Sequence, residues 1–257
     1  MRALLVQTDV RWHAPRDNFA AVEGLLRAAG QPFDICVLPE MFSTGFTMDP
    51  SACPPDTGQR SLGRLRDWSR AYGACFCAST IYPLEGGFAN RMFAVADGEV
   101  LGYYDKRHLF RMAGEADAYR PGGPAPVVVT YRGVRLLLQV CYDLRFPVTS
   151  SNVGVAYDAA IYVASWPSAR RAHWTALLRA RAIENQCYVL GVNRVGTDGN
   201  GLRYAGESVA FGPLGETVAA LGEREGAEAV TLDPGGLADV RERLPFLRDA
   251  DSFTVHA

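Results

Sequence analysis

The sequence predicts an α/β protein arranged as a four-layer α-β-β-α sandwich, with two mixed sheets in the middle and helices on both outer faces. Apolar runs typical of buried strands alternate with segments of helical periodicity, and this order of elements occurs twice along the chain. Each half also ends in a hairpin. Antiparallel hairpin strands fit the edges of two mixed sheets better than a single doubly wound sheet.

The first half of the chain predicts strand, helix, strand, helix, strand and hairpin in that order. Strands are expected at 3–10, 33–38 and 75–81, where apolar residues form near-continuous runs. The pair Asp97-Gly98 separates the strand-like segments 92–96 and 100–104 and is typical of a tight hairpin turn. Two helices are indicated by residues that recur at helical spacing: Phe19, Val22, Leu26 and Ala29, then Leu62, Leu65, Ser69 and Tyr72.

The second half repeats that order. Strands are expected at 134–140, 159–164 and 187–192, with a short helix after Pro147. A longer helix between the last two strands is indicated by a stripe of four residues: Trp174, Leu177, Leu178 and Arg181. The closing hairpin spans 207–221 and turns at Gly212-Pro-Leu-Gly215.

Composition limits the class of protein without choosing a function. The chain has 257 residues, of which 48% are hydrophobic and 21% charged, and no Pro/Ser/Gly-rich linker interrupts it. We therefore expect one domain over residues 1–257. The net charge of −2 and the scattered basic residues do not indicate a basic patch that would bind nucleic acid or a membrane surface. The apolar stretch in segment 1–9 is too short for a signal peptide, and no segment reaches the length of a membrane span, so we expect a cytoplasmic protein.

Six cysteines raise the question of disulfides or metal binding. Five of them fall within or at the end of apolar strand-like runs, which favours free thiols in a reducing compartment: Cys36, Cys75, Cys77, Cys141 and Cys187. The pair Cys75-Phe-Cys77 does not have the usual spacing of zinc ligands, and no second pair or nearby histidine completes a site. We expect no metal.

Three strand-like runs end in residues that can carry chemistry. Glu40 follows the run 34–39, Lys106 follows 101–105, and Cys141 follows 136–140. The carboxyl ends of strands are where open α/β sheets usually place their ligands. Each residue also has an ordinary interpretation: Cys141 as a small buried hydrophobe, Glu40 as a helix N-terminal or loop acid, and Lys106 as part of a solvated basic turn.

A carboxylate, an ammonium and a thiol together are the parts that acyl transfer needs. Glu40 is the candidate base for the Cys141 thiol, because a carboxylate in a dry pocket has a raised pKa. Lys106 and the backbone amide of Tyr142 are the candidate donors to an oxyanion. The histidines are weaker candidates for the base, because none ends a strand-like run: His13, His108, His173 and His256.

Three segments around these residues resemble the signature segments of the nitrilase superfamily of carbon–nitrogen hydrolases. They are 38–42 (Leu-Pro-Glu-Met-Phe), 104–110 (Tyr-Asp-Lys-Arg-His-Leu-Phe) and 139–147 (Gln-Val-Cys-Tyr-Asp-Leu-Arg-Phe-Pro). The resemblance implies an α-β-β-α sandwich and a catalytic Glu40, Lys106 and Cys141. It also implies a homodimer with no metal or organic cofactor.

The resemblance implies further site residues. Segment 111–115 resembles the region of the family's second glutamate, which is assigned to Glu115, with Asp117 as a competing choice. Segment 165–167 (Ser-Trp-Pro) resembles the substrate-facing loop of amidase members, although Trp166 would also suit core packing.

Within the superfamily the chain resembles bacterial proteins of the ω-amidase-like branch, through segments 41–48, 166–170, 180–186 and 193–201. This implies hydrolysis of the terminal amide of 2-oxoglutaramate and 2-oxosuccinamate. A cation must then bind the substrate carboxylate, and the candidates are Arg145, Arg170 and Arg171; Arg145 would equally suit a structural ion pair.

Other functions stay open at this point. Another amidase of the superfamily would act on deaminated glutathione or an N-carbamoyl amino acid, and a nitrilase would act on a nitrile. An inactive binding protein is disfavoured by the intact Glu40, Lys106 and Cys141. A nucleotide-binding protein is disfavoured because no glycine-rich loop follows the first strand.

Overall fold

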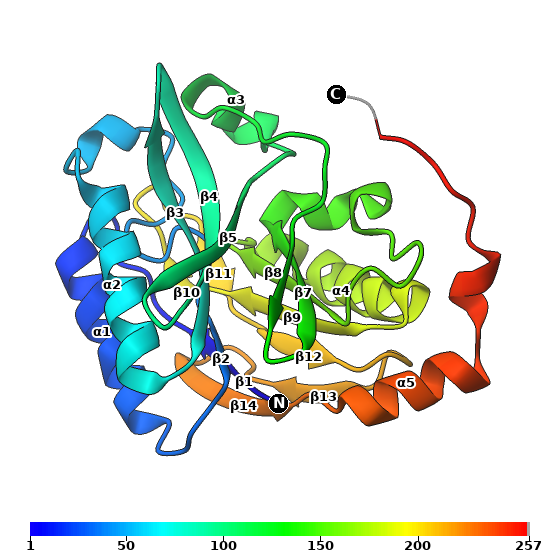
Figure 1. Cartoon of the computed structure of the whole chain (residues 1–257). Coiled ribbons are helices and arrows are strands. Elements are labelled where there is room, and N and C mark those ends of the chain that lie inside the picture. Colours follow the sequence, from blue (N-terminus) through cyan, green and yellow to red (C-terminus); the bar gives the residue numbers. More distant parts are fainter. Residues whose placement is uncertain (256–257) are drawn as a thin grey trace.

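The computed structural model describes residues 1–255, and its elements form four layers (Figure 1). The order of strands across the first sheet is β14 (Gly226–Thr231), β1 (Arg2–Gln7), β2 (Ile35–Val37), β3 (Cys75–Leu84), β4 (Gly87–Ala96) and β5 (Glu99–Asp105). The order across the second is β13 (Thr217–Ala220), β12 (Val209–Phe211), β9 (Tyr188–Asn193), β8 (Ala159–Ala164), β7 (Val134–Val140) and β6 (Val128–Tyr131). The predicted α-β-β-α sandwich is confirmed.

Helices cover the outer faces of the two sheets. The first sheet carries α1 (Pro15–Ala28) and α2 (Thr57–Tyr72), and α4 (Arg171–Asn185) lies on the opposite side of the sandwich (Figure 1). The remaining α-helices are α3 (Glu115–Ala118) and α5 (Pro234–Arg243). Short 3-10 helices are η1 (Pro50–Ala52), η2 (Arg111–Ala113), η3 (Cys141–Arg145), η4 (Pro147–Ser150), η5 (Ser168–Arg170) and η6 (Phe246–Asp249).

Two apolar layers hold the sandwich together. Between the sheets, Leu5 and Val37 of the first sheet belong to the same buried cluster as Ile161 of the second. Outside the first sheet, Val22 of α1 and Trp68 of α2 pack in a separate cluster with the opposite face of the strands. Alternate residues of one strand therefore serve both layers, as the two-residue period of a strand requires.

Both sheets are mixed, as predicted. Strands β1, β2 and β3 pair in parallel, as do β7, β8 and β9, while the outer strands pair antiparallel. The turn between β4 and β5 places Asp97 at φ 52° and Gly98 at φ 80°, the left-handed geometry that tight hairpins favour. The hairpin of β12 and β13 is also present.

Several elements differ from the sequence prediction. The first strand stops at Gln7 rather than residue 10, and the helix after Pro147 is the four-residue η4. Strands β6 and β14, helix α5 and the hairpin of β10 (Val195–Thr197) and β11 (Arg203–Ala205) were not predicted. Their runs are short, and β14 exposes part of its length, so local periodicity is weak there.

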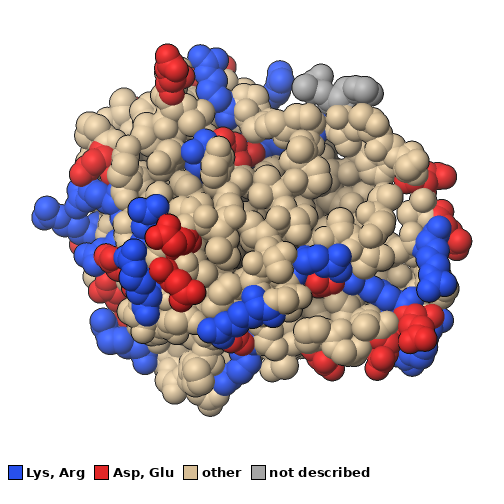
Figure 2. All heavy atoms as spheres, viewed as in Figure 1, with Lys and Arg blue, Asp and Glu red and all other residues tan. Residues whose placement is uncertain are grey.

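The fold brings strand ends of both sheets to one edge. Glu40 lies three residues beyond β2, Lys106 directly follows β5, and Cys141 directly follows β7. Charged side chains of both signs are interspersed around the periphery of the face in Figure 2, and the middle of that face is largely uncharged.

Gln7 joins the two halves of the sandwich at the end of β1. Its side chain is fully buried and donates to the carbonyls of Gly222 (2.9 Å) and Arg224 (2.7 Å). Its carbonyl oxygen accepts from both the backbone N–H (2.9 Å) and the hydroxyl (2.7 Å) of Ser208. One side chain thus pairs with the N–H and hydroxyl of the fully buried Ser208 and links them to the turn that precedes β14.

We expect Gln7→Ala to lower the free energy of unfolding by about 1–3 kcal/mol, because it leaves buried donors and acceptors unpaired. For a chain of this size that is a fall of about 2–10 °C in Tm, measured by differential scanning calorimetry. Gln31→Ala is the matched control, because Gln31 is exposed and only accepts a bond from Arg2. Equal Tm values for the two variants would contradict this role for Gln7.

Candidate active site

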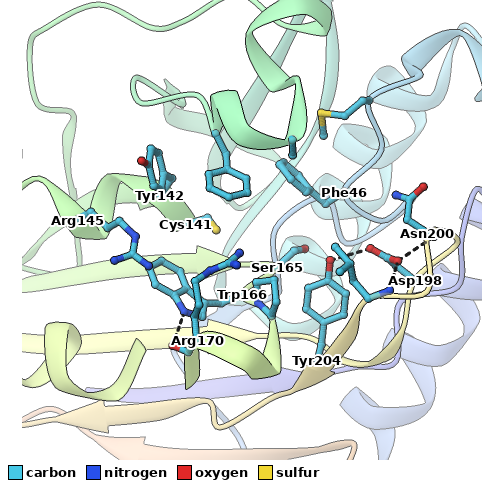
Figure 3. A pocket seen from close by; sticks show the side chains of 15 residues that line it. Phe46, Cys141, Tyr142, Arg145, Ser165, Trp166, Arg170, Asp198, Asn200 and Tyr204 are labelled. Atoms are coloured by element: carbon cyan, nitrogen blue, oxygen red, sulfur yellow. Dashed lines mark hydrogen bonds between the residues drawn. The ribbon is translucent and has the colours of Figure 1, made fainter. Parts of the chain in front are cut away.

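A small pocket of about 100 Å³ opens over Cys141 at the edge where the strand ends meet (Figure 3). Aromatic residues form much of its wall: Phe46, Phe110, Tyr142, Trp166 and Tyr204. Its size suits a small molecule rather than a peptide.

Cys141 is held in a conformation that few residues other than glycine adopt. It is the first residue of η3, has a φ of 47°, and leaves 8% of its surface exposed to the pocket. Met41, the residue after Glu40, has a similar φ of 46°. Left-handed backbone at non-glycine residues is uncommon and clusters at functional sites.

Behind the pocket, Lys106 lies between two glutamates. Its Nζ donates to Glu40 Oε1 (2.9 Å) and to both carboxylate oxygens of Glu115 (3.0 and 2.9 Å). Asn90 of β4 donates through Nδ2 to Glu40 Oε1 (2.7 Å) and Glu115 Oε1 (3.2 Å). All four side chains are fully buried. Of the two acids considered for the second glutamate, Glu115 lies in this cluster and Asp117 is exposed.

Backbone groups fix the outer oxygens of the two glutamates. The N–H of Ser165, at the end of β8, donates to Glu40 Oε2 (2.8 Å), and the N–H of Phe110 donates to Glu115 Oε2 (2.6 Å). The same Ser165 N–H acts to lower the pKa of the Cys141 thiol, although burial and Glu40 outweigh it.

The charges of this cluster favour a neutral thiol. Burial would lower the pKa of Lys106, but Glu115 and Glu40 outweigh it and raise that pKa well above the usual lysine range. Burial raises the pKa of Glu115, which Lys106 partly offsets. Burial and the Glu40 carboxylate hold the pKa of Cys141 well above its usual range, against the opposing effect of Lys106. Sulfur therefore carries its proton until a reaction removes it.

Two of the three candidate arginines line the pocket. The Arg145 guanidinium lies over the Trp166 ring (4.8 Å to the centroid), and Arg170 lies over the Phe110 ring (5.4 Å). Both point toward the space beside Cys141 (Figure 3). Arg171 does not line the pocket and pairs instead with Glu223 (2.9 Å).

Tyr142 and Trp166 also lie in the pocket wall. The Tyr142 ring packs edge-on against Phe110 (5.1 Å between centroids), and Trp166 donates through Nε1 to the carbonyl of Arg170 (2.9 Å). Trp166 is 4% exposed. It lines the pocket and also packs against Trp174 of α4, so it contacts both the pocket and the core.

Sequence reasoning missed several residues of the site. Asn90, together with Arg91, interrupts an apolar strand, which was its only local signal. Phe46 lies 4.8 Å from Lys106 Nζ. The β10–β11 loop supplies Asp198, whose carboxylate accepts from Tyr204 (2.8 Å) and so shapes the far wall.

The structure also shows where the cysteines and histidines lie. Within residues 1–255, all six cysteines are free and buried, and no cluster of three or more His, Cys, Asp or Glu side chains could hold a metal. His108 contacts Asp143, His173 contacts Arg145, and His256 lies outside the described residues.

No helix in the described part of the chain is long and apolar enough to cross a membrane.

Comparison with known proteins agrees with this geometry. The chain is 45% identical to the omega-amidase YafV of Yersinia enterocolitica, over 99% of this chain and 98% of that protein. It is 29% identical to the 2-oxoglutaramate amidase of Bacillus subtilis, over 95% of each chain.

Solved structures show the same fold. XC1258 from Xanthomonas campestris, a CN-hydrolase superfamily protein with an arsenic adduct in its active site, superposes with a TM-score of 0.91 at 37% identity, covering 100% of this chain and 99% of that one. A mutant of the amidase from Nesterenkonia sp. AN1, which shows Michael addition of acrylamide at the active-site cysteine, gives a TM-score of 0.83 at 28% identity, covering 96% of this chain and 98% of that one.

The sequence pattern of the carbon-nitrogen hydrolase family matches residues 2–242. This match extends over almost the whole sandwich, including every residue of the Lys106 cluster and Cys141. The chain therefore belongs to the carbon-nitrogen hydrolases of the nitrilase superfamily, enzymes that act on carbon–nitrogen bonds other than peptide bonds.

Proposed function

We propose that this hydrolase cleaves the terminal amide of small 2-oxo acid amides, such as 2-oxoglutaramate and 2-oxosuccinamate, through a thioester on Cys141. The observation that carries the proposal is the pocket itself. Its wall contains Cys141, with a φ of 47°, together with Arg145 and Arg170, and the buried Glu40–Lys106 pair is near enough to shift the pKa of the thiol. The names of the omega-amidase and 2-oxoglutaramate amidase relatives support this substrate class.

In the first half of the reaction, Cys141 attacks the amide carbon while Glu40 removes the proton from sulfur. Lys106 Nζ and the backbone N–H of Tyr142 stabilise the oxyanion; Tyr142 is the second residue of η3, where helix N–H groups lack an intrahelical acceptor. Glu40 then gives the proton to the amide nitrogen as the carbon–nitrogen bond breaks. Ammonia leaves, and the acyl group remains on sulfur as a thioester.

The second half reverses these roles. Glu40 removes a proton from water as its oxygen attacks the thioester carbon, and the same donors hold the oxyanion. The carbon–sulfur bond breaks, the proton returns to sulfur, and the acid is released. Glu115 takes no proton in this scheme and keeps Lys106 charged and in place.

The carboxylate of the substrate binds at the arginines. Arg145 is the principal candidate, because it is the last residue of η3, the turn that begins at Cys141, and lies on Trp166; neither Arg145 nor Arg170 has an acidic partner among the ion pairs of residues 1–255. A guanidinium on an aromatic face is well placed to accept a carboxylate in two parallel hydrogen bonds.

We also propose a single domain over residues 1–257 that works as a cytoplasmic homodimer, without a cofactor. The apolar side chain of Val148 on η4, which follows the nucleophile turn, is 52% exposed and supports pairing through this region.

Cys141→Ala is expected to reduce amide hydrolysis by about 10⁴-fold or more, because no other thiol lines the pocket. Ammonia release measures the rate, and mass spectrometry of enzyme quenched during turnover should find the acyl group on Cys141. Cys187→Ala is the matched control, since Cys187 is a buried free thiol next to β9. Full activity in Cys141→Ala, or an acyl group on another cysteine, would refute the mechanism.

Arg145→Ala is expected to raise KM for 2-oxoglutaramate by about tenfold to hundredfold, the loss of one charge-assisted interaction. Arg171→Ala should leave KM unchanged, because Arg171 pairs with Glu223 outside the pocket. Steady-state kinetics on an uncharged short amide should show little effect of either variant. An unchanged KM in Arg145→Ala would remove this residue from carboxylate binding.

A substrate panel tests the class of amide. We expect 2-oxoglutaramate and 2-oxosuccinamate to have the highest kcat/KM among five classes, the others being deaminated glutathione, an N-carbamoyl amino acid and the nitrile matching one of the amides. The pocket volume and the arginines favour a short anionic substrate. Equal turnover of all five would leave the substrate assignment without support.

A further inference from the structure

Asp143 is a fully buried carboxylate two residues after Cys141, outside the pocket, that accepts four hydrogen bonds. Its Oδ1 accepts from the backbone N–H (3.0 Å) and ring Nδ1 (2.7 Å) of His108. Its Oδ2 accepts from the hydroxyl of Tyr104 (2.9 Å) and the backbone N–H of Val140 (3.1 Å). Two oxygens with four donors leave this carboxylate fully satisfied without water.

The donors to Asp143 are close in sequence to Cys141 and Lys106, the two residues that are proposed to act on the amide. Val140 ends β7 and immediately precedes Cys141, whereas Tyr104 and His108 lie two residues before and after Lys106. Strand β5 belongs to the first sheet and β7 to the second. Asp143 therefore ties the lysine segment of one sheet to the nucleophile turn of the other.

Further contacts fix the lysine segment. The Tyr104 hydroxyl accepts from the backbone N–H of Arg107 (3.3 Å) while it donates to Asp143. Burial and the Asp143 carboxylate raise the pKa of Tyr104 well above that of a free phenol, so this hydroxyl stays a donor. The His108 ring stacks on Phe146 with centroids 3.8 Å apart and planes inclined by 15°.

The nucleophile turn is closed by the same carboxylate. The bond from the Val140 N–H to the Asp143 side chain spans Cys141, whose φ of 47° is unfavourable for a residue with a Cβ atom. On the other side of the turn, the Phe146 N–H donates to the Asp143 carbonyl (2.9 Å). Hydrogen bonds to Asp143 therefore hold the chain both before and after the strained backbone of Cys141.

We propose that Asp143, together with His108, is a positioning residue that fixes the separation of the Lys106 ammonium from Cys141 and the Tyr142 N–H. Oxyanion stabilisation depends on donors held within a few tenths of an ångström of the developing charge. A misplacement of about 1 Å costs about 10²-fold in rate. The inference rests on the proposed amidase function, because Asp143 acts only through Lys106 and Cys141.

Asp143→Asn keeps the shape of the side chain but replaces one acceptor oxygen with an NH₂ group. The NH₂ group is itself a donor, so it would face other donors: either the two N–H groups of His108 or the N–H of Val140. We expect kcat for the preferred amide to fall by about tenfold to hundredfold with KM within about threefold of wild type. Unfolded enzyme would also lower the apparent kcat at an unchanged KM, so kcat is expressed per folded molecule, with the folded fraction measured by circular dichroism.

Asp158→Asn is the matched control. Asp158 accepts from Arg135 (2.9 and 2.6 Å) and Arg241 (2.9 Å) and directly precedes β8, at the end of the sandwich away from the site. Replacing the Asp158 carboxylate with an amide should lower Tm, while kcat per folded molecule stays at the wild-type value. If Asp143→Asn and Asp158→Asn give the same kcat per folded molecule, the positioning role is overturned.

His108 provides a second test that does not depend on Asp143→Asn folding. Its side chain is 21% exposed, so His108→Ala removes the Nδ1 donor with limited disturbance of the core. His108→Asn restores a donor near the Nδ1 position and should recover part of the kcat that His108→Ala loses. Equal kcat in wild type and His108→Ala overturns the assignment of His108.

The double variant shows whether the pair acts as a unit. If it does, Asp143→Asn/His108→Ala is no slower than the slower single variant, because both remove the same constraint. Multiplied losses in kcat would mean independent roles and overturn the pairing. Wild-type protein that hydrolyses no amide of the panel refutes the proposed function and this inference with it, whereas active wild type with an equally active Asp143→Asn refutes the inference alone.

Discussion

The burial of the Lys106 ammonium is the constraint on which the rest of this site depends. Removing a charge from water costs several kcal/mol, and the cost is recovered only if partners surround the ion with good geometry. Here the partners are Glu40 and Glu115, and they come from a loop after β2 and from the start of α3. Asn90 of β4 bonds to both acids. The fold must therefore assemble four separate segments before this one lysine is stable.

The same cluster sets the resting state of the nucleophile. Two carboxylates against one ammonium leave the surroundings of Cys141 negative, which opposes a second negative charge on sulfur. Many thiol enzymes store a thiolate in advance, stabilised by a nearby cation. Under the proposed mechanism the proton leaves sulfur as the new bond forms, so the approach of a substrate carbonyl and proton transfer to Glu40 are coupled.

The strand ends bearing Glu40, Lys106 and Cys141 were predictable because apolar runs and the residues that follow them are local features of the sequence. The resemblance to known signature segments added Glu115. Asn90 and the Asp143–His108 contact were not predictable, because their partners lie on distant segments of the chain, and Asp143 and His108 follow strands of different sheets. The same reason hid β14, which pairs with the distant β1, whereas β10 and β11 are three residues each and too short to show a two-residue period.

Strand β14 gives the molecule an order of assembly. It pairs antiparallel with β1 along its whole length, from Arg2 opposite Thr231 to Gln7 opposite Gly226. A chain growing from its N-terminus must complete the second sheet before the first sheet gains this edge strand. Pairings of such large sequence separation are slow to form. The strands that lead to Glu40 and Lys106 thus share a sheet whose last member follows every strand of the second sheet in the chain, and amidase activity is expected only after residues 226–231 have been synthesised.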